Sequence, residues 1–478
     1  MTLRHRLVLV WTAIALTVAG VNAFRMASNA IEEAGAIDAA AAGEDAGAPL
    51  DPPTREAELL GKFTIALGGL SAFGPVGGGT EVLLNAQLLA EDDAPTSHRL
   101  GYAVLLGEVS GWTEGAEFAR GIEAESNDDS ARALAARVAA AMDARAVDPA
   151  AMPPADACAE FERSLGYFGR VLCGGGQAEA TRALLGVVGA GAWYGLTALL
   201  GAGALVWVLV ALFGASRASR IRPADDRGAA VLLGETFVVW LALFYALNLG
   251  GGLAVQKLTD ALVSDPEATG TSISLAFSFV AFFLSLAALA YPLLRGMTRA
   301  ELLRLCGLSR GAGLAREALA GVVCYLSAVP LLIGGFGVFF LLNWLSQQLL
   351  GPSPSPSHPA AELIGGASGL ELALLFAVAS IAAPIVEEIV FRGVLYGHMR
   401  SVVTPRVRWL SILASAVLSS AVFAAVHPQG LLFTPVLGGL ATGFALSREL
   451  RDSLIAPMVA HAIANAVTLT IGMAIMGS

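Results

Sequence analysis

Six polar side chains stand in apolar stretches near the C-terminal end of the 478-residue chain, at spacings that suit acid and base chemistry. These residues are Glu387, Glu388, Arg392, His427, His461 and Asn465. An ionisable group at the centre of a membrane helix costs about 2.5–3.5 kcal/mol, so such groups are expected to pair or to line a cavity. The six residues are therefore candidates for a functional site.

The two neighbouring glutamates have unequal partners. Glu388 and Arg392 stand at i and i+4, so they lie on one helix face and can form an ion pair. Glu387 points about 100° away and has no such partner in its own helix. We therefore expect Glu387 to face groups on other helices and to act as a general base.

Two further apolar stretches supply candidates for those groups. The stretch "FAAVH" ends with His427, and "HAIAN" places His461 and Asn465 at i and i+4 on one helix face. Either histidine alone is typical of a hydrogen-bonded packing residue. Three stretches that each contribute a polar group favour one shared site over separate packing roles.

The composition indicates that these stretches lie in a membrane. Hydrophobic residues make up 56% of the chain, charged residues 14%, and the mean hydropathy is +0.68. Soluble domains have about 45–50% apolar and about 25% charged residues. Nucleic acid is not an expected partner, because the chain has no basic stripe and no interleaving of aromatic and basic residues.

The four cysteines stand singly, and Cys158 and Cys173 either pair or remain thiols.

Hydropathy predicts an all-α fold, a polytopic membrane helix bundle of about nine spans. The spans are expected at 7–23, 183–214, 229–250, 272–294, 319–345, 370–391, 409–427, 431–446 and 454–475. Arginines precede the first span and follow the second, fourth, sixth and eighth, whereas the short loops between carry none. Since cytoplasmic loops are enriched in arginine, the N-terminus is expected inside. The loop "GPSPSPSHPA" at 351–360 is then expected outside.

Charge and hydropathy divide the chain into four parts. Residues 1–23 are an N-terminal anchor or a cleaved signal peptide, because "MTLRHR" and "VNA" also suit a signal peptide. Residues 24–180 hold 25 of the 39 acidic residues and form a helical extracytoplasmic region of unknown function, open to a protein partner. Residues 181–228 form a span and a cytoplasmic loop, and 229–478 hold the polar motifs.

The depths of the three polar stretches in the bilayer disagree. At about 1.5 Å per residue, His461 is about 12 Å from Ser453, where its span begins, and Glu387 is about 20 Å from Arg400. By the same rise, His427 is about 27 Å from Trp409, at the far side. A shared site therefore needs a tilted or buried start to the seventh span.

The motifs resemble a known family. "EEIVFR", "FAAVH" and "HAIAN" match, in order, the EExxxR, FxxxH and HxxxN motifs of the CPBP family of CaaX-protease and bacteriocin-processing membrane proteins, also called Abi proteins. The resemblance covers roughly 230–478, so it implies that 229–478 form an intramembrane protease domain. It assigns nothing to 24–180.

The resemblance implies an intramembrane glutamate-type endopeptidase. By motif position, Glu387 would be the general base and His427 would hold the attacking water. His461 and Asn465 would stabilise the oxyanion, and Glu388 and Arg392 would orient the site. The implied substrate is a membrane-associated protein or peptide.

Several alternatives stay open. Glu387, His427 and His461 could ligate zinc, but the chain has no HExxH pair, so we favour a mechanism without a cofactor. A catalytically silent immunity-type scaffold and a proton-coupled transporter are the competing functions, although no internal repeat supports a transporter. The expected location is the bacterial inner membrane.

Overall fold

The fold is helical wherever it is described. The computed structural model describes residues 2–41, 52–70, 83–91, 94–214, 219–221, 223–224, 226–263, 266–350, 363–364, 367–403 and 407–476. These residues contain no strand. The prediction of an all-α fold is confirmed. The loop at 351–360 lies outside the described residues.

Nine helices among the described residues are long and apolar enough to cross a membrane. They are Leu3–Ala23, Gln177–Phe213, Arg227–Leu262, Thr269–Leu294, Leu314–Leu349, Gly369–Val402, Arg408–Ala425, Leu431–Arg451 and Ile455–Ile475. Each coincides with a predicted span, which confirms a multi-pass integral membrane protein. The third helix is longer than predicted, because the chain stays helical from the end of the apolar run at 250 to Leu262.

The chain forms two compact units. The first consists of Met1–Ser28 and Ala192–Thr470, and the second of Asn29–Gly191 and Ile471–Ser478. Three long helices contribute residues to both units: α1 (Leu3–Ala41), α9 (Gln177–Phe213) and α22 (Ile455–Met476). The boundaries predicted at 23, 180 and 228 stay predictions.

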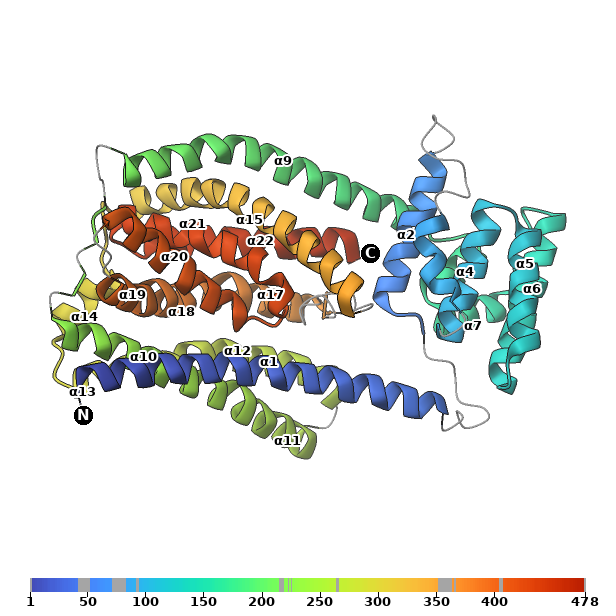
Figure 1. Ribbon diagram of the computed structural model, residues 1–478. Helices are drawn as coiled ribbons and strands as arrows, with labels where there is room; N and C mark the ends of the chain where they lie inside the picture. Colours follow the sequence, from blue (N-terminus) through green and yellow to red (C-terminus); the bar gives the residue numbers. More distant parts are fainter. Residues whose placement is uncertain are drawn as a thin grey trace. The chain divides into compact units, whose positions relative to one another are not determined.

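The second unit is a bundle of short helices, shown in cyan and blue in Figure 1. They are α2 (Arg55–Leu70), η2 (Leu84–Ala90), α4 (Thr96–Val109), α5 (Trp112–Glu125), α6 (Asp129–Val147), α7 (Ala155–Leu165) and α8 (Tyr167–Leu172). Phe168 is fully buried at its centre, and its ring leaves no space for a side chain at Gly61 or Gly101. Cys158 and Cys173 form a disulfide, which agrees with an oxidising compartment for this unit.

The first unit holds the remaining helices, and its long helices run side by side in Figure 1. Besides parts of α1, α9 and α22, they include α10 (Arg227–Tyr245), η3 (Ala246–Gly251), α11 (Gly252–Leu262), α12 (Pro266–Ser285), η4 (Leu286–Leu289), α13 (Ala290–Leu294), α14 (Arg299–Cys306) and α15 (Leu314–Leu350). The C-terminal group is α17 (Gly369–Ala377), η5 (Val378–Ala382), α18 (Ala383–Glu387), η6 (Glu388–Leu395), α19 (Tyr396–Val402), α20 (Arg408–Ala425), η7 (Leu431–Phe433) and α21 (Thr434–Arg451).

Glycines let α15 and α21 approach each other closely. A side chain at Gly439 would meet the Leu331 carbonyl oxygen at 2.3 Å, and one at Gly443 would meet Ala328 at 2.4 Å. Small residues four apart are the usual means by which membrane helices bring their backbones into contact. This packing fixes α21, which contacts the buried end of the polar cluster.

The sixth span is an interrupted helix. Two π-helical segments, η5 and η6, flank the short α18 that ends at Glu387. In a π-helix, each carbonyl accepts a hydrogen bond from the N–H of the residue five positions later. For Ala379 that residue is Pro384, which has no N–H. The Ala379 oxygen accepts from Asn465 Nδ2 at 2.6 Å instead. The sixth and ninth spans are thereby joined beside the glutamates.

The structure brings the three polar stretches together although their distances from the helix starts differ. The first turn of α20 is exposed, with Trp409 50% exposed. Ser453 and Leu454, just before α22, are buried and bond to Ser309 and Gly307. The ninth span thus begins among buried residues of the protein, whereas the seventh begins exposed.

A second buried ion pair ties the ends of the sixth and eighth spans. Arg400 donates from Nε and Nη2 to both carboxylate oxygens of Glu449 at 3.0 Å, and Tyr396 donates to Glu449 at 2.7 Å. Arg400 is therefore a packing residue as well as one of the basic residues that indicate the cytoplasmic side. The sequence gives no spacing signal for this pair, because its members are 49 residues apart.

The arrangement of spans predicts which surface residues lie on each side of the membrane. Ala300 in α14 and Ala133 in α6 are exposed, while Cys306 and Cys324 are buried thiols. In spheroplasts, an impermeant thiol reagent should label Ala133→Cys directly and Ala300→Cys only after the membrane is opened. Labelling of Ala300→Cys in sealed spheroplasts would contradict the topology.

Candidate active site

Three helices bring Glu387 and two histidines together. His427 Nε2 and His461 Nε2 each lie 3.8 Å from the same Glu387 oxygen, Oε2. Glu387 ends α18, His427 follows the last turn of α20, and His461 lies in the second turn of α22. The Glu387 side chain is 12% exposed and that of His427 is 19% exposed. The cluster is thus largely buried, with a small part of the Glu387 and His427 side chains exposed.

Behind this cluster lies a fully buried chain of charges. Arg392 Nη1 lies 2.9 Å from Glu388 Oε1, which is the pair that the i, i+4 spacing predicts. The same Glu388 oxygen lies 2.9 Å from His461 Nδ1. Glu388 is 0% and Arg392 is 1% exposed. Glu388 therefore connects the arginine to the histidine that faces Glu387.

The hydrogen-bond partners fix which imidazole nitrogens carry protons. His427 Nδ1 lies 2.6 Å from the Phe423 carbonyl oxygen, which can only accept, so this nitrogen donates. His461 Nδ1 likewise donates to the Glu388 carboxylate. In the neutral form both histidines then present an Nε2 lone pair toward Glu387. A carboxylate and two lone pairs all require a donor between them, such as a water molecule or a proton.

Charge balance limits the protonation of the buried groups. Arg392 and Glu388 neutralise each other, so the remaining pair, Glu387 and His461, is neutral only if it holds one extra proton. That proton lies on the Glu387 carboxyl or on His461 Nε2, and in either form the four groups sum to zero. An uncompensated charge would be costly at this depth. The site can therefore move one proton without creating a net buried charge.

Aromatic rings enclose the charged groups, and their contacts were not predicted from the sequence. Arg392 lies over the Phe423 ring at 4.4 Å and over the Phe444 ring at 5.5 Å. Phe423 also packs on His427 with ring centroids 4.1 Å apart. A cation over an aromatic face is stabilised when it is desolvated. The contact of Phe423 could have been predicted from its position four residues before His427, on the same helix face. No sequence pattern indicated a role for Phe444.

Asn465 has a structural partner in addition to its predicted role. Its Nδ2 donates to the Ala379 oxygen, the carbonyl that Pro384 leaves without a donor. One amide hydrogen remains for another acceptor. Asn465 thus joins two spans, and any oxyanion contact uses its second hydrogen.

One further buried histidine was not foreseen. His398 is fully buried, and its Nδ1 donates to the Ala230 oxygen at 2.7 Å. His398 lies about three turns beyond Glu387 in the same span. It therefore contributes to the packing of α19 against α10 and not to the cluster.

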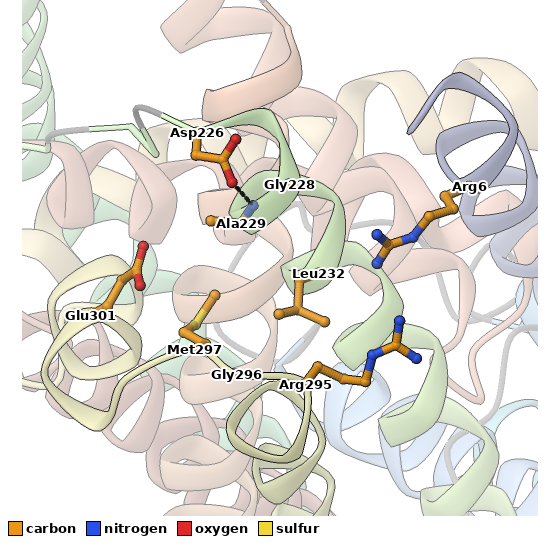
Figure 2. Close-up of a pocket in the computed structure, with 9 residues that line it drawn as sticks. All are labelled: Arg6, Asp226, Gly228, Ala229, Leu232, Arg295, Gly296, Met297 and Glu301. Atoms are coloured by element: carbon orange, nitrogen blue, oxygen red, sulfur yellow. Dashed lines mark hydrogen bonds between the residues drawn. The ribbon is translucent and has the colours of Figure 1, made fainter. Parts of the chain in front are cut away.

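The pocket in Figure 2 is separate from the cluster. It is lined by residues from the ends of α1, α10, α13 and α14, among them Arg6, Asp226, Arg295 and Glu301. Figure 2 shows the Asp226 carboxylate bonded to the Ala229 N–H at the start of α10, and none of the six predicted site residues lines the pocket. The candidate site is therefore defined by side-chain chemistry and not by this depression.

The distances test whether the cluster fits zinc. The donors are of the kind that zinc takes, but two ligands about 2.05 Å from a tetrahedral ion lie about 3.3 Å apart. The separations here are 3.8 Å, and no group of three His, Cys, Asp or Glu residues has metal-site geometry in the described part of the chain. As placed, the three side chains do not fit a closed zinc site.

The fold and the cluster define a multi-pass membrane protein with a buried carboxylate and imidazole site. Residues 369–467 match the model of the family described as type II CAAX prenyl endopeptidase Rce1-like. The matched segment contains all six predicted site residues, which confirms the resemblance to the CPBP family there and supports a protease in general. Comparisons with curated proteins and with solved structures gave no match.

The buried ion pair predicts a stability effect. Glu388→Gln leaves Arg392 as a buried charge without its counter-ion, so the protein should lose about 3–5 kcal/mol of stability. Thermal unfolding of the detergent-solubilised protein measures this loss. The double variant Glu388→Leu with Arg392→Met removes both charges and should recover part of it. A Glu388→Gln variant as stable as the wild type would contradict the role of the pair.

Proposed function

We propose that the protein is an intramembrane endopeptidase that cleaves a membrane-associated protein or peptide with a water molecule activated by Glu387. The observation that carries this proposal is the convergence of His427 Nε2 and His461 Nε2 on one oxygen of Glu387. It lies within the segment that matches the CAAX endopeptidase family. A hydrolase of this kind needs a base, a means to hold water and a donor for the oxyanion.

The attacking water would lie between Glu387 and His427. Both present acceptors 3.8 Å apart, and a water about 2.8 Å from each can donate one hydrogen to Oε2 and one to Nε2. Its lone pair then points away from both, toward a scissile carbonyl carbon. In this arrangement Glu387 removes the proton as the water attacks.

His461 would supply the oxyanion donor in its protonated form. The Glu388 carboxylate accepts from Nδ1 and stabilises an imidazolium, whose Nε2–H is then free to donate. The second amide hydrogen of Asn465 is the other candidate donor. Donors fixed in a desolvated site stabilise a developing oxyanion far more than donors in water.

Collapse of the tetrahedral intermediate would return the proton. Glu387 holds the proton taken from water and donates it to the leaving amine as the peptide bond breaks. The cycle then ends with the carboxylate ionised and His461 protonated, as it began. At the tetrahedral intermediate the four buried groups sum to +1, and the oxyanion carries the negative charge that balances them.

The substrate class follows from the location of the site. A cluster within membrane helices reaches peptide bonds at or in the bilayer, so the substrate is a membrane-associated protein or peptide precursor. A prenylated substrate requires a host that prenylates proteins, whereas a location in a bacterial inner membrane favours an unprenylated precursor. Residues 24–180 are proposed to lie outside the cytoplasm and to bind a protein partner.

The first test of the function neutralises the proposed base. Glu387→Gln keeps the shape of the side chain and removes the base, so the cleavage rate should fall by roughly 10²–10⁴ with thermal stability nearly unchanged. Quantitative proteomics of membranes with wild-type and variant protein identifies the substrate, and a peptide from it serves for kinetics.

A matched control separates catalysis from expression. Glu371 lies in the same span, in a capping box with Ser368 that a glutamine also completes. Glu371→Gln should therefore cleave at the wild-type rate. Full activity of Glu387→Gln would exclude the glutamate mechanism and favour the silent scaffold.

A second test concerns metal. We propose that no metal takes part, because water is held by Glu387 and His427 alone. Enzyme stripped with a chelator and shown by elemental analysis to contain no zinc should retain its cleavage rate. Loss of activity on stripping with recovery on adding zinc would replace this mechanism by a metalloprotease in which the three side chains move closer to bind the ion.

A further inference from the structure

The first span makes specific polar contacts with the bundle that holds the candidate site, although it lies outside the matched segment. Asn22 in α1 is 7% exposed, and its Nδ2 donates to the Val18 oxygen at 2.8 Å and to the Ala425 oxygen at 3.0 Å. Val18 belongs to the same helix, whereas Ala425 is 403 residues away. A buried polar side chain in a membrane helix is expected to form a hydrogen bond that serves function or helix packing.

The partner of Asn22 is the end of the helix that presents His427. Ala425 is the last residue of α20, where carbonyl groups lack donors within the helix. Pro428, three residues on, has no N–H to offer, so an external donor is needed nearby. Asn22 supplies that donor.

The contact is two residues from the proposed water-holding histidine. His427 follows Ala425 by two residues, and its ring turns back so that Nδ1 bonds the Phe423 oxygen of the same helix end. This conformation aims Nε2 at Glu387. A shift of the α20 end would therefore shift Nε2 relative to the base.

Further contacts fix the height of α1 against the bundle. Arg6 donates from Nε and Nη2 to both oxygens of Glu235 in α10, each at 2.7 Å. Val10 and Ile14 are buried in the same hydrophobic core as residues of α10 and η6. Because Arg6 and Asn22 are about 24 Å apart along a straight helix, an ion pair at one end and a hydrogen bond at the other set both depth and rotation.

We propose that Asn22 is a positioning residue for His427 and that α1 is retained as part of the catalytic bundle and not removed after Ala23. Only the predicted effect on the cleavage rate rests on the proposed function; the contacts of Asn22 do not. Removal of residues 1–23 would take away Arg6, the two buried aliphatic side chains and Asn22 together.

The kinetic experiment compares two asparagines in the purified full-length protein. Asn22→Leu should lower kcat by roughly 10- to 100-fold with KM unchanged, because a displacement of about 1 Å in a catalytic group has effects of this size. Asn22→Gln keeps a donor and should restore most of the rate. Asn248 is the control, since its Nδ2 also bonds a carbonyl four residues back, Phe244, and Asn248→Leu should keep the wild-type kcat.

A second readout does not depend on proteolysis. Carbethoxylation of His427, followed by peptide mass spectrometry and referred to the exposed His5, reports the environment of its ring. The carbethoxylation rate of His427 should differ from that of the wild type in Asn22→Leu and equal it in Asn248→Leu, each measured well below the melting temperature of the variant. If the wild type cleaves nothing, the proposed function fails, while this measurement still decides the positioning role.

Two results would overturn the inference. One is an Asn22→Leu variant whose kcat and His427 reactivity both equal those of the wild type. The other is membrane-purified active protein whose intact mass shows that residues 1–23 have been removed. Detection of the N-terminal peptide through Asn22 in the active protein supports it.

Discussion

The buried chain from Arg392 through Glu388 to His461 is the constraint on which the rest of the site depends. Arg392 is held by the Phe423 and Phe444 rings and by the Ala441 carbonyl oxygen, which its Nη2 donates to at 3.3 Å. It is the counter-ion of Glu388, and Glu388 in turn fixes the orientation of His461. Without the arginine, a second buried carboxylate would compete with Glu387 for the same proton. In the proposed mechanism, with the arginine present, Glu387 and His461 hold one proton between them in a group without net charge, which suits acid and base chemistry in a membrane.

Contacts between helices hold the Arg392, Glu388 and His461 side chains in place. Glycines at 439 and 443 bring α21 against α15, and α21 carries the ring of Phe444. Pro384 leaves the Ala379 carbonyl without a donor and Asn465 donates to it, so the sixth span is bonded to the ninth about two turns before the glutamates. π-helical segments are often found at functional sites, because the wider turn redirects side chains. Stability and the proposed catalysis therefore depend on the same contacts. Most substitutions at Arg392, Glu388 or His461 should affect both.

The sequence predicted what local spacing and hydropathy determine. Long apolar runs were sufficient for the nine spans, and the Glu388 and Arg392 pair follows from i, i+4 geometry alone. Contacts between helices were not predictable in this way. The bond from His461 to Glu388 and that from Asn22 to Ala425 join residues 73 and 403 positions apart, and no periodicity reports such distances. Nor does the sequence show that α22 begins in the protein interior, where Ser453 bonds to the Ser309 backbone oxygen.

The central claim is that Glu387 and His427 act as one unit on one water molecule, and a double-mutant cycle tests it most directly. Cleavage rates are measured for Glu387→Gln, for His427→Ala and for the double variant, each checked for folding by its melting temperature. If both side chains hold the same water, the double variant should be no slower than the slower single variant, as for other catalytic groups that act as a unit. Losses that multiply, so that the double variant falls by the product of the two single effects, would show independent roles and contradict the account.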